Sequence, residues 1–386
     1  MTIRFAMNPL RRAITLAAAA LLLSGGAWAQ AIKIANVVEL SGAGATSGTN
    51  FKNGVELAVK EINAAGGILG HKIETSTADT QSNPGVAKGL AQKAIDDDVF
   101  AVFGPVFSGS IMVSMAETRR AEIPNFTGGE AAGITKQGNP YIFRTSFTQD
   151  TAMPKVARYI AGNLKARTVA LIYVNNDYGK GGREALVKAL EPLGVKLAAD
   201  LSTDQGQIDF SAPVLKAKQS GADVVFVYTN EEESARALRE LRKQGVNKPV
   251  VGETTLVGQK VIELAGEAAN GAVAHVGLTV DAPIQPMKDF RAKFEREYKY
   301  LTDHNGIKGY TGVYILKAAI EKVGKLDRKA VAQALHGLKI SAAKVPGVIM
   351  DVSIDANGDL DRESFMVEAR DGHQVVKEIL PALGAK

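Results

Sequence analysis

The stretch IKIANVVELSGAGATSGTNFKNGVELAVKEINAAGG, residues 32–67, decides the fold class of this chain. Ile32–Val38 is rich in β-branched and apolar residues, which predicts a strand, and a glycine-rich turn follows it. Asn50–Ala65 carries apolar residues at helical spacing, and Gly66-Gly67 provides a stop signal. A strand, a glycine turn and an amphipathic helix in this order predict one unit of an α/β fold.

The same alternation recurs along most of the chain. The expected strands are 32–38, 72–77, 99–103, 123–126, 141–143, 169–174, 195–201, 224–228 and 250–252, and the expected helices are 50–65, 84–95, 109–120, 151–164, 178–190, 210–219 and 231–244. Alternating strands and helices predict mostly parallel sheets with helices on both faces. Because the order starts again after residue 150, we expect two doubly wound lobes rather than one large sheet.

The C-terminal third follows a different pattern. Helices are expected at 286–298, 310–323 and 328–336 without strands between them, and short strands are expected near 348–350, 364–369 and 374–377. Consecutive helices suggest that the chain returns here to cover a lobe that is already built.

The first 29 residues have the composition of an export signal. Three arginines precede an apolar run at 13–23, and Ala27-Trp28-Ala29 offers a small-residue cleavage site. The apolar run is too short to cross a bilayer as a helix. We therefore expect 1–29 to be removed and the mature protein to begin near Gln30 in the periplasm. Because the chain has no cysteine, we expect no lipid anchor.

Composition narrows the class of protein further. The formal charge of +5 falls to +2 without the three leader arginines, and no basic block remains, so no nucleic-acid partner is expected. After residue 29 no apolar run approaches membrane-spanning length, and no membrane segment is expected. The absence of cysteine excludes disulfides, thiolate nucleophiles and thiolate metal ligands.

Catalytic and metal-binding patterns are missing from the sequence. The five histidines are far apart, and no G-x-S-x-G nucleophile turn is present. Asp355–Asp359 is similar to a calcium loop, but its glycine comes at the fourth position instead of the sixth, so a turn between two strands is the better interpretation. We expect no enzyme activity, no metal and no cofactor.

Three turns at the carboxyl ends of expected strands are candidate ligand sites, because open parallel sheets bind ligands there. They are Ser41–Gly48, Gly104–Ser110 and Asn175–Gly179. Ser108 is the expected N-cap of the second turn, where the hydroxyl and the amides of Gly109 and Ser110 suit a carboxylate. Taken alone, each turn fits an ordinary flexible connection or helix cap better than a ligand site. Glu231–Glu233 suits a helical first turn with its acidic face in solvent.

Several segments together resemble the periplasmic substrate-binding proteins of leucine/isoleucine/valine-type (branched-chain amino acid) ABC transporters. The matching segments, in the family's order between Ile32 and Lys377, are Leu40–Gly48, Gly54–Gly70, Gly104–Ser110, Tyr141–Thr145, Asn176–Gly179 and Ile354–Asp359. The resemblance implies a type 1 periplasmic binding protein: two α/β lobes joined by three crossings, with the ligand in the cleft between them. The crossings fall near 146–150, 276–281 and 347–354, which gives residues 30–147 plus 278–350 for lobe 1 and 148–277 plus 351–386 for lobe 2.

The resemblance also implies where the ligand binds. The residues at matching positions are Ser47, Ser108, Gly109, Ser110, Gly128, Gly129, Glu130, Tyr178, Asn230, Glu253 and Thr254. The first lobe of such proteins holds the carboxylate and ammonium of an amino acid, and Tyr178 matches the cleft tyrosine of the second lobe. Glu130 departs from the family's usual Ser or Thr, Thr254 stands at the acidic position that pairs with the ammonium, and Ser47 replaces an aromatic residue.

The family implies a binding function with no chemistry of its own. We expect a monomeric periplasmic solute-binding protein that closes on an amino acid or related small carboxylate or amide and delivers it to an ABC permease. Two alternatives stay open: a sensory binding protein that serves a receptor, and an exported enzyme on the same fold, for which Glu130 is the one candidate acid or base. The ligand class also stays open, among aliphatic and polar amino acids, amides and aromatic acids.

Overall fold

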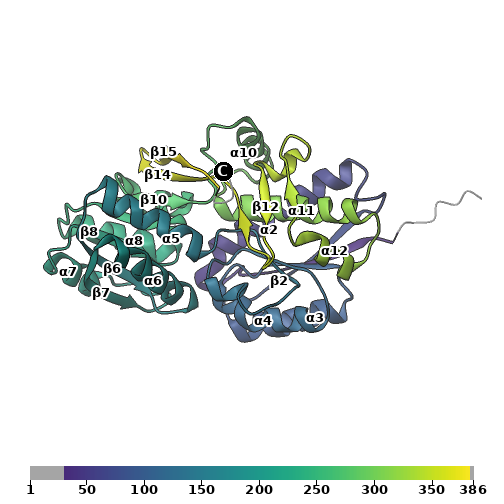
Figure 1. Ribbon diagram of the computed structural model, residues 1–386, viewed down its shortest axis with the longest axis horizontal. Coiled ribbons are helices and arrows are strands. Elements are labelled where there is room, and N and C mark those ends of the chain that lie inside the picture. The colour runs from purple at the N-terminus through teal and green to yellow at the C-terminus, as the bar shows by residue number, and fades with distance from the viewer. Residues whose placement is uncertain (1–29, 383–386) are drawn as a thin grey trace, which may run out of the picture.

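The computed structural model describes residues 30–382, which form two α/β lobes side by side (Figure 1). The first lobe is built on a parallel five-stranded sheet of order β2-β1-β3-β4-β5. Its strands are β1 (Ile32–Val38), β2 (Ile73–Asp79), β3 (Ala101–Phe103), β4 (Asn125–Thr127) and β5 (Ile142–Arg144), and the helices between them are α2 (Ala45–Ala64), α3 (Pro84–Asp96) and α4 (Ser108–Arg120).

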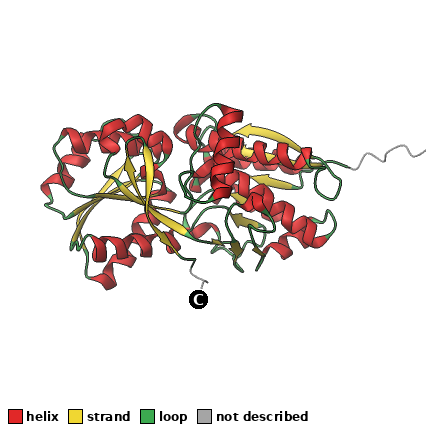
Figure 2. Cartoon of the chain, turned by 90° about the horizontal axis from the view of Figure 1, so that it is seen from above, coloured by secondary structure: helices red, strands yellow, loops and turns green. Residues whose placement is uncertain are grey.

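The second lobe is built on a seven-stranded sheet of order β15-β14-β10-β9-β8-β6-β7. The strands are β6 (Thr168–Val174), β7 (Lys196–Thr203), β8 (Val224–Tyr228), β9 (Val250–Glu253), β10 (Val273–Val276), β14 (Ser364–Arg370) and β15 (His373–Leu380), and the helices are α5 (Gln149–Arg158), α6 (Asp177–Leu190), α7 (Ser211–Gln219), α8 (Glu231–Lys243) and α9 (Gln259–Ala265). The strands from β6 to β10 are parallel, while β14 and β15 run antiparallel. Helices cover both faces of this sheet (Figure 2). The predicted α/β class with two doubly wound lobes is confirmed.

Three further helices return the chain to the first lobe: α10 (Gln285–Tyr298), α11 (His304–Val323) and α12 (Arg328–Leu335). Two glycines let α11 approach α2 closely. A Cβ on Gly54 would lie 2.0 Å from the carbonyl oxygen of Gly306, and one on Gly309 would lie 2.1 Å from that of Phe51. The side chains on the first turns of α11 therefore have a fixed position beside the cleft.

The boundary after residue 350 is where the structure differs from the expected lobes. The expected strand at 348–350 is wrong, because a 3₁₀ turn occupies Pro346–Val348. The next residues form a small antiparallel sheet of β11 (Lys339–Ile340), β12 (Val352–Ile354) and β13 (Leu360–Asp361). The 355–359 turn of that sheet packs on the first lobe, since Arg144 donates its amide to the Gly358 carbonyl at 2.9 Å and its Nε to Asp359 at 2.7 Å.

The chain reaches the second sheet only at β14, and Figure 1 shows the yellow C-terminal strands divided between the lobes. We therefore propose that the third crossing runs through 361–364 instead of 347–354, and that lobe 1 extends to residue 361. Residues 145–148 link β5 to α5, and residues 277–284 link β10 to α10. The expected leader at 1–29 lies outside the described residues.

Candidate functional site

A cavity of about 200 Å³ lies between the lobes, at the carboxyl ends of their parallel strands. All the residues expected at the ligand site line it except Glu253 and Thr254. Four further lining residues lie in the turns expected to bind a ligand: Val106, Phe107, Asn176 and Asp177. No sequence pattern pointed to the other lining residues, which are Ser82, Pro84, Gln205, Glu231, Thr255, His304, Asn305 and Lys308. The volume limits the occupant to a small molecule.

The first turn of α4 forms one wall of the cavity. Ser108 was expected to cap this helix, but Phe107 is the N-cap and Ser108 is the first helical residue. The Ser108 hydroxyl instead accepts a hydrogen bond from the Ala131 amide at 3.2 Å, so it braces the neighbouring loop. The first amides of a helix have no partner within it, and the helix dipole adds positive potential. The amides of Gly109 and Ser110 therefore remain suited to an anionic group.

Glu39 holds the loop before this wall in place, and no sequence pattern pointed to it. Its fully buried carboxylate accepts the amides of Val106 and Phe107 at 3.0 and 3.1 Å. Burial raises the pKa of Glu39, and these hydrogen bonds oppose the rise. The first turn of α2 packs against the same residue, because a Cβ on Gly48 would lie 1.9 Å from the Glu39 carbonyl oxygen. Close backbone approach therefore explains Gly48.

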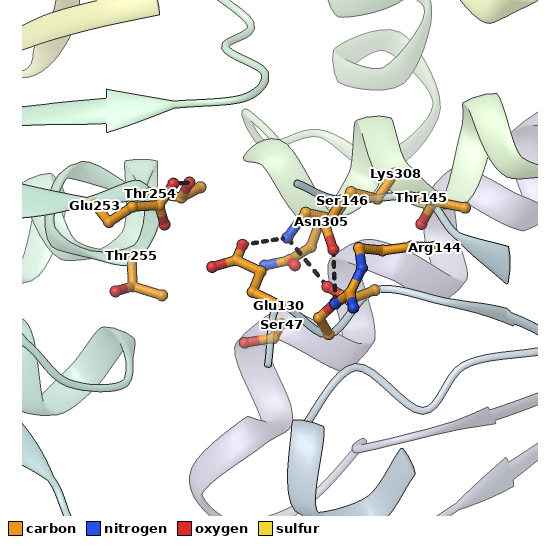
Figure 3. A network of polar contacts seen from close by, with 12 residues as sticks. Ser47, Glu130, Arg144, Thr145, Ser146, Glu253, Thr254, Thr255, Asn305 and Lys308 are labelled. Atoms are coloured by element: carbon orange, nitrogen blue, oxygen red, sulfur yellow. Dashed lines mark hydrogen bonds and ion pairs between the residues drawn. The ribbon is translucent and has the colours of Figure 1, made fainter. Parts of the chain in front are cut away.

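Glu130 and Lys308 form a buried ion pair at the back of the cavity. The Lys308 ammonium lies 3.0 Å from Glu130 Oε1 and 3.3 Å from the Gly128 carbonyl oxygen. Both side chains are more than nine-tenths buried. Burial and the nearby Glu253 raise the pKa of Glu130 to about 7, although Lys308 favours its charged form. Figure 3 shows Glu130 between its own lobe and the segment of the second lobe that carries Glu253.

Glu231 connects the two lobes, and the expectation that it faces solvent is wrong. It is the first residue of α8 in the second lobe and is only 4% exposed. Ser47 of the first lobe donates its hydroxyl to Glu231 Oε1 at 2.7 Å, and Asn305 approaches the same oxygen at 3.4 Å. Burial raises the pKa of Glu231. Direct hydrogen bonds across the cleft mean that the lobes lie in a closed arrangement.

Tyr178 lines the second-lobe side of the cavity, from the first turn of α6. Its ring stacks on Tyr228 with centroids 4.2 Å apart, and its hydroxyl lies 3.1 Å from Thr255 Oγ1. Asn176 caps α6 by accepting the Gly179 amide, and Asp177 is the first helical residue. The stacking and the hydroxyl contact fix the orientation of the Tyr178 ring, so that it can pack against a ligand.

Glu253 and Thr254 lie behind the cavity wall instead of in it. The Thr254 hydroxyl donates to Glu253 Oε1 at 2.5 Å, and His275 Nδ1 lies 3.1 Å from that oxygen. Burial lowers the pKa of His275 to about 3, which keeps it neutral. Thr254 instead lines a small enclosed space near the crossings with Phe147 and Arg362. The adjacent residue Thr255 takes the cavity-lining position.

Comparison with known proteins places this geometry in a family. Residues 31–374 match the family model described as periplasmic binding protein. The chain belongs to the periplasmic binding protein family. A Leu/Ile/Val-binding protein of Rhizobium johnstonii is 29% identical to this periplasmic binding protein over 89% of this chain and 93% of its own length.

Two solved structures of similar fold extend the comparison. A branched-chain amino acid transporter substrate-binding protein of Streptococcus pneumoniae, in complex with isoleucine, has a TM-score of 0.82 at 26% identity and covers 91% of this chain and 99% of its own. A solute-binding protein of an ABC transporter from R. palustris, in complex with benzoate, has a TM-score of 0.84 at 20% identity and covers 92% of this chain and 98% of its own. The predicted branched-chain amino acid substrate-binding family is confirmed.

Two other kinds of feature are absent from the part of the chain that the structure describes. Within residues 30–382 no group of three His, Asp or Glu side chains is placed to hold a metal ion. Over the same residues, no helix combines the length and apolar character needed to span a membrane. The turn at Asp355–Asp359 joins β12 to β13, as expected, and Asp355 accepts the amides of Asn357 and Asp359.

Proposed function

We propose that this protein is the periplasmic solute-binding component of an ABC importer and that it binds an amino acid or a related small carboxylate or amide. The observation that carries the proposal is a cavity lined by residues of both lobes, with the Ser47–Glu231 hydrogen bond joining the lobes at its wall. Such a cavity encloses a ligand only when the lobes close.

Hinge closure is the mechanism that this arrangement favours. A ligand docks first against the α4 amides and Lys308 of the first lobe, and the second lobe then brings Tyr178 and Asn230 over it. A ligand shifts a conformational equilibrium only by its differential affinity for the two states. Contacts with Tyr178 exist only when the lobes are closed, so they provide that difference.

The carboxylate end of the ligand belongs on the first lobe. The relative from R. johnstonii is named for leucine, isoleucine and valine, and the two solved structures hold isoleucine and benzoate, all of which carry a carboxylate. Gly109 and Ser110 offer helix amides, and the nearby Lys308 offers a cation. A carboxylate between them gains charge-assisted hydrogen bonds.

The remaining parts of the proposal concern location and partner. We propose that residues 1–29 are cleaved on export, that the mature protein is a monomer in the periplasm without a lipid anchor, and that an ABC permease recognises its closed form. No cofactor takes part, and the protein catalyses no reaction.

A ligand screen on the processed protein tests this function. The full chain is produced with its own leader, recovered from the periplasm and refolded after denaturation to remove any bound ligand. A thermal-shift panel then contains the common amino acids, small amides and aromatic acids. A ligand at 100 times its Kd stabilises the folded state by about 2.7 kcal/mol, which gives a clear shift. Small-angle scattering should show a smaller radius of gyration with the ligand. No hit, or a hit without compaction, would count against the proposal.

A further inference from the structure

The charged side chains that line the cavity are mostly acidic. Glu130, Asp177 and Glu231 line it, against a single cation, Lys308. His304 also lines it, and burial together with Lys308 lowers its pKa well below the usual value, so it carries no charge. Glu130 already has Lys308 as its partner at 3.0 Å. The unbalanced charge of the cavity therefore belongs to Glu231 and to Asp177 at the rim.

Glu231 accepts its side-chain hydrogen bonds from the neutral groups of Ser47 and Asn305. Lys308 favours its charged form, but among residues 30–382 no Lys, Arg or His nitrogen forms an ion pair with it. Its place in the first turn of α8 favours the ionised form through the helix dipole. A buried carboxylate without an ion-pair partner is costly, and a ligand cation in the adjoining cavity would reduce that cost.

Two further features of the cavity suit a ligand with a protonated nitrogen. The Nδ1 atom of His304, a residue that is 96% buried and lines the cavity, has no hydrogen-bond partner in the described structure, so a polar ligand atom can satisfy it. The Tyr178 ring, held against Tyr228, supplies an aromatic surface of the kind that attracts cations.

We propose that this cleft selects a small molecule of net positive charge, a basic amino acid or a related amine, and that Glu231 of the second lobe holds its protonated nitrogen. This inference rests on the proposed binding function and adds the ligand class to it. The carboxylate end stays on the first lobe with the α4 amides and Lys308, and the cationic end points to Glu231. Each end of the ligand then contacts a different lobe, so charge recognition and closure depend on each other.

Matched ligand pairs test the charge selection by isothermal titration calorimetry. L-Lysine is compared with L-norleucine, which lacks the side-chain ammonium, and L-arginine with L-citrulline, its uncharged analogue; benzoate represents simple acids. We expect at least one charged member to bind about tenfold or more tightly than its uncharged partner, which corresponds to one charge-assisted hydrogen bond, and benzoate to bind weakest. Equal or tighter binding of the uncharged members, tightest binding of benzoate, or no binding of any probe would overturn the inference.

A variant pair separates charge recognition from lobe closure. Glu231→Gln keeps an oxygen that can accept the Ser47 hydrogen bond but removes the charge. Glu232→Gln is the matched control, because Glu232 lies beside it in α8 with its side chain about half exposed and paired with Arg236. We expect Glu231→Gln to weaken binding of the charged ligand of each pair about tenfold and to change the affinity for its uncharged analogue by no more than about twofold. Glu232→Gln should change neither affinity appreciably.

The variants and the ligand pairs together distinguish failure of this inference from failure of the proposed function. If Glu231→Gln weakens the charged and uncharged members equally, Glu231 acts only in closure and the inference is overturned. If an uncharged amino acid or benzoate binds tightly with compaction of the protein, the solute-binding function stands and the selection for positive charge falls.

Discussion

Lys308 stabilises the charge of Glu130 at the back of the cleft, and neither side chain has much access to solvent. Removing one partner of a buried ion pair typically costs about 3 to 5 kcal/mol, because the remaining charge is left without compensation. The sequence drew attention to Glu130 but not to Lys308, because 178 positions separate the two residues.

Replacing that cation should destabilise the protein in a pH-dependent way. In Lys308→Met the folded-state pKa of Glu130 should rise above its present value of about 7, further from the ordinary 4.5. A carboxyl group with a raised folded-state pKa loses stability as pH rises from the unfolded value through the folded one. Urea unfolding should therefore show a loss of about 3 kcal/mol or more at pH 8 and a smaller loss at pH 5. Lys317→Met, on the same helix, removes a partly exposed pair with Glu321 and should cost less than about 1 kcal/mol. Equal losses at both pH values would contradict the prediction.

Asp303 should make a second pH-dependent contribution to the stability of the protein. Burial and Glu231 raise the pKa of Asp303 to about 7 from its ordinary 3.8, so the free energy of unfolding is greatest at low pH and falls as pH rises from about 4 towards 7. Asp303→Asn keeps a side chain that can cap α11 and removes the charge. The free energy of unfolding of Asp303→Asn, relative to that of the wild type, should increase by on the order of 1 to 3 kcal/mol as pH rises from 5 to 8. The check is the free energy of unfolding of both proteins across this range; parallel curves would contradict the expectation.

At the level of elements, the contact between α2 and α11 positions the cleft residues His304 and Lys308. Its closest points are glycines, because any larger residue would meet backbone atoms of the facing helix. Backbone atoms cannot move aside as the end of a flexible side chain can. The helix pair therefore tolerates little increase in volume.

Gly309→Ala should disturb both stability and binding. The new Cβ would lie 2.1 Å from the Phe51 carbonyl oxygen, so α11 would have to shift. We expect a loss of about 1 to 3 kcal/mol in thermal or urea unfolding and weaker binding of the ligand found in the screen. Gly89→Ala is the control, since Gly89 lies within α3 and its Cβ would meet nothing within 4 Å. That control should be neutral or slightly stabilising. A Gly309→Ala protein as stable as the control would show that the helices can separate without cost.

Local sequence patterns predicted most of the elements, for clear physical reasons. The helix α8 and the strand β8 agree with their expected bounds to within one residue, whereas α2 begins at Ala45, five residues before its expected start. Local patterns did not predict β10 and α9, which are short and carry weak periodicity. The helix α11 begins six residues earlier than expected, because His304–Gly309 has no apolar period; its place is set by the Asp303 cap and by packing on α2.

At the scale of the whole molecule, a buried hydrogen bond holds the two lobes together across the cleft. The Ser47–Glu231 hydrogen bond joins α2 of the first lobe to α8 of the second. Buried hydrogen bonds to a charged acceptor contribute roughly 1.5 to 3 kcal/mol. This bond therefore stabilises the closed arrangement relative to the open one.

Ser47→Ala should open the ligand-free protein. Loss of about 1.5 kcal/mol from the closed state changes the open-to-closed ratio about tenfold, and small-angle scattering should show a larger radius of gyration. Ser41→Ala is the matched control, because the Ser41 hydroxyl donates to Asp79 within the same lobe. That variant should keep the wild-type radius. If Ser47→Ala keeps it too, the hydrogen bond does not bias closure.

The sequence by itself determined the α/β class, the two lobes and the turns that line the cleft. Those features depend on local periodicity, on glycine turns and on the rule that parallel strands end at a common edge. Only the tertiary structure decided which side chains meet. It paired Glu130 with Lys308, placed Glu231 across the cleft from Ser47, and put Thr255 in the wall in place of Thr254. These contacts join residues far apart in the chain or turn on the direction of one side chain, and pairing, burial and charge compensation exist only after the lobes have packed together.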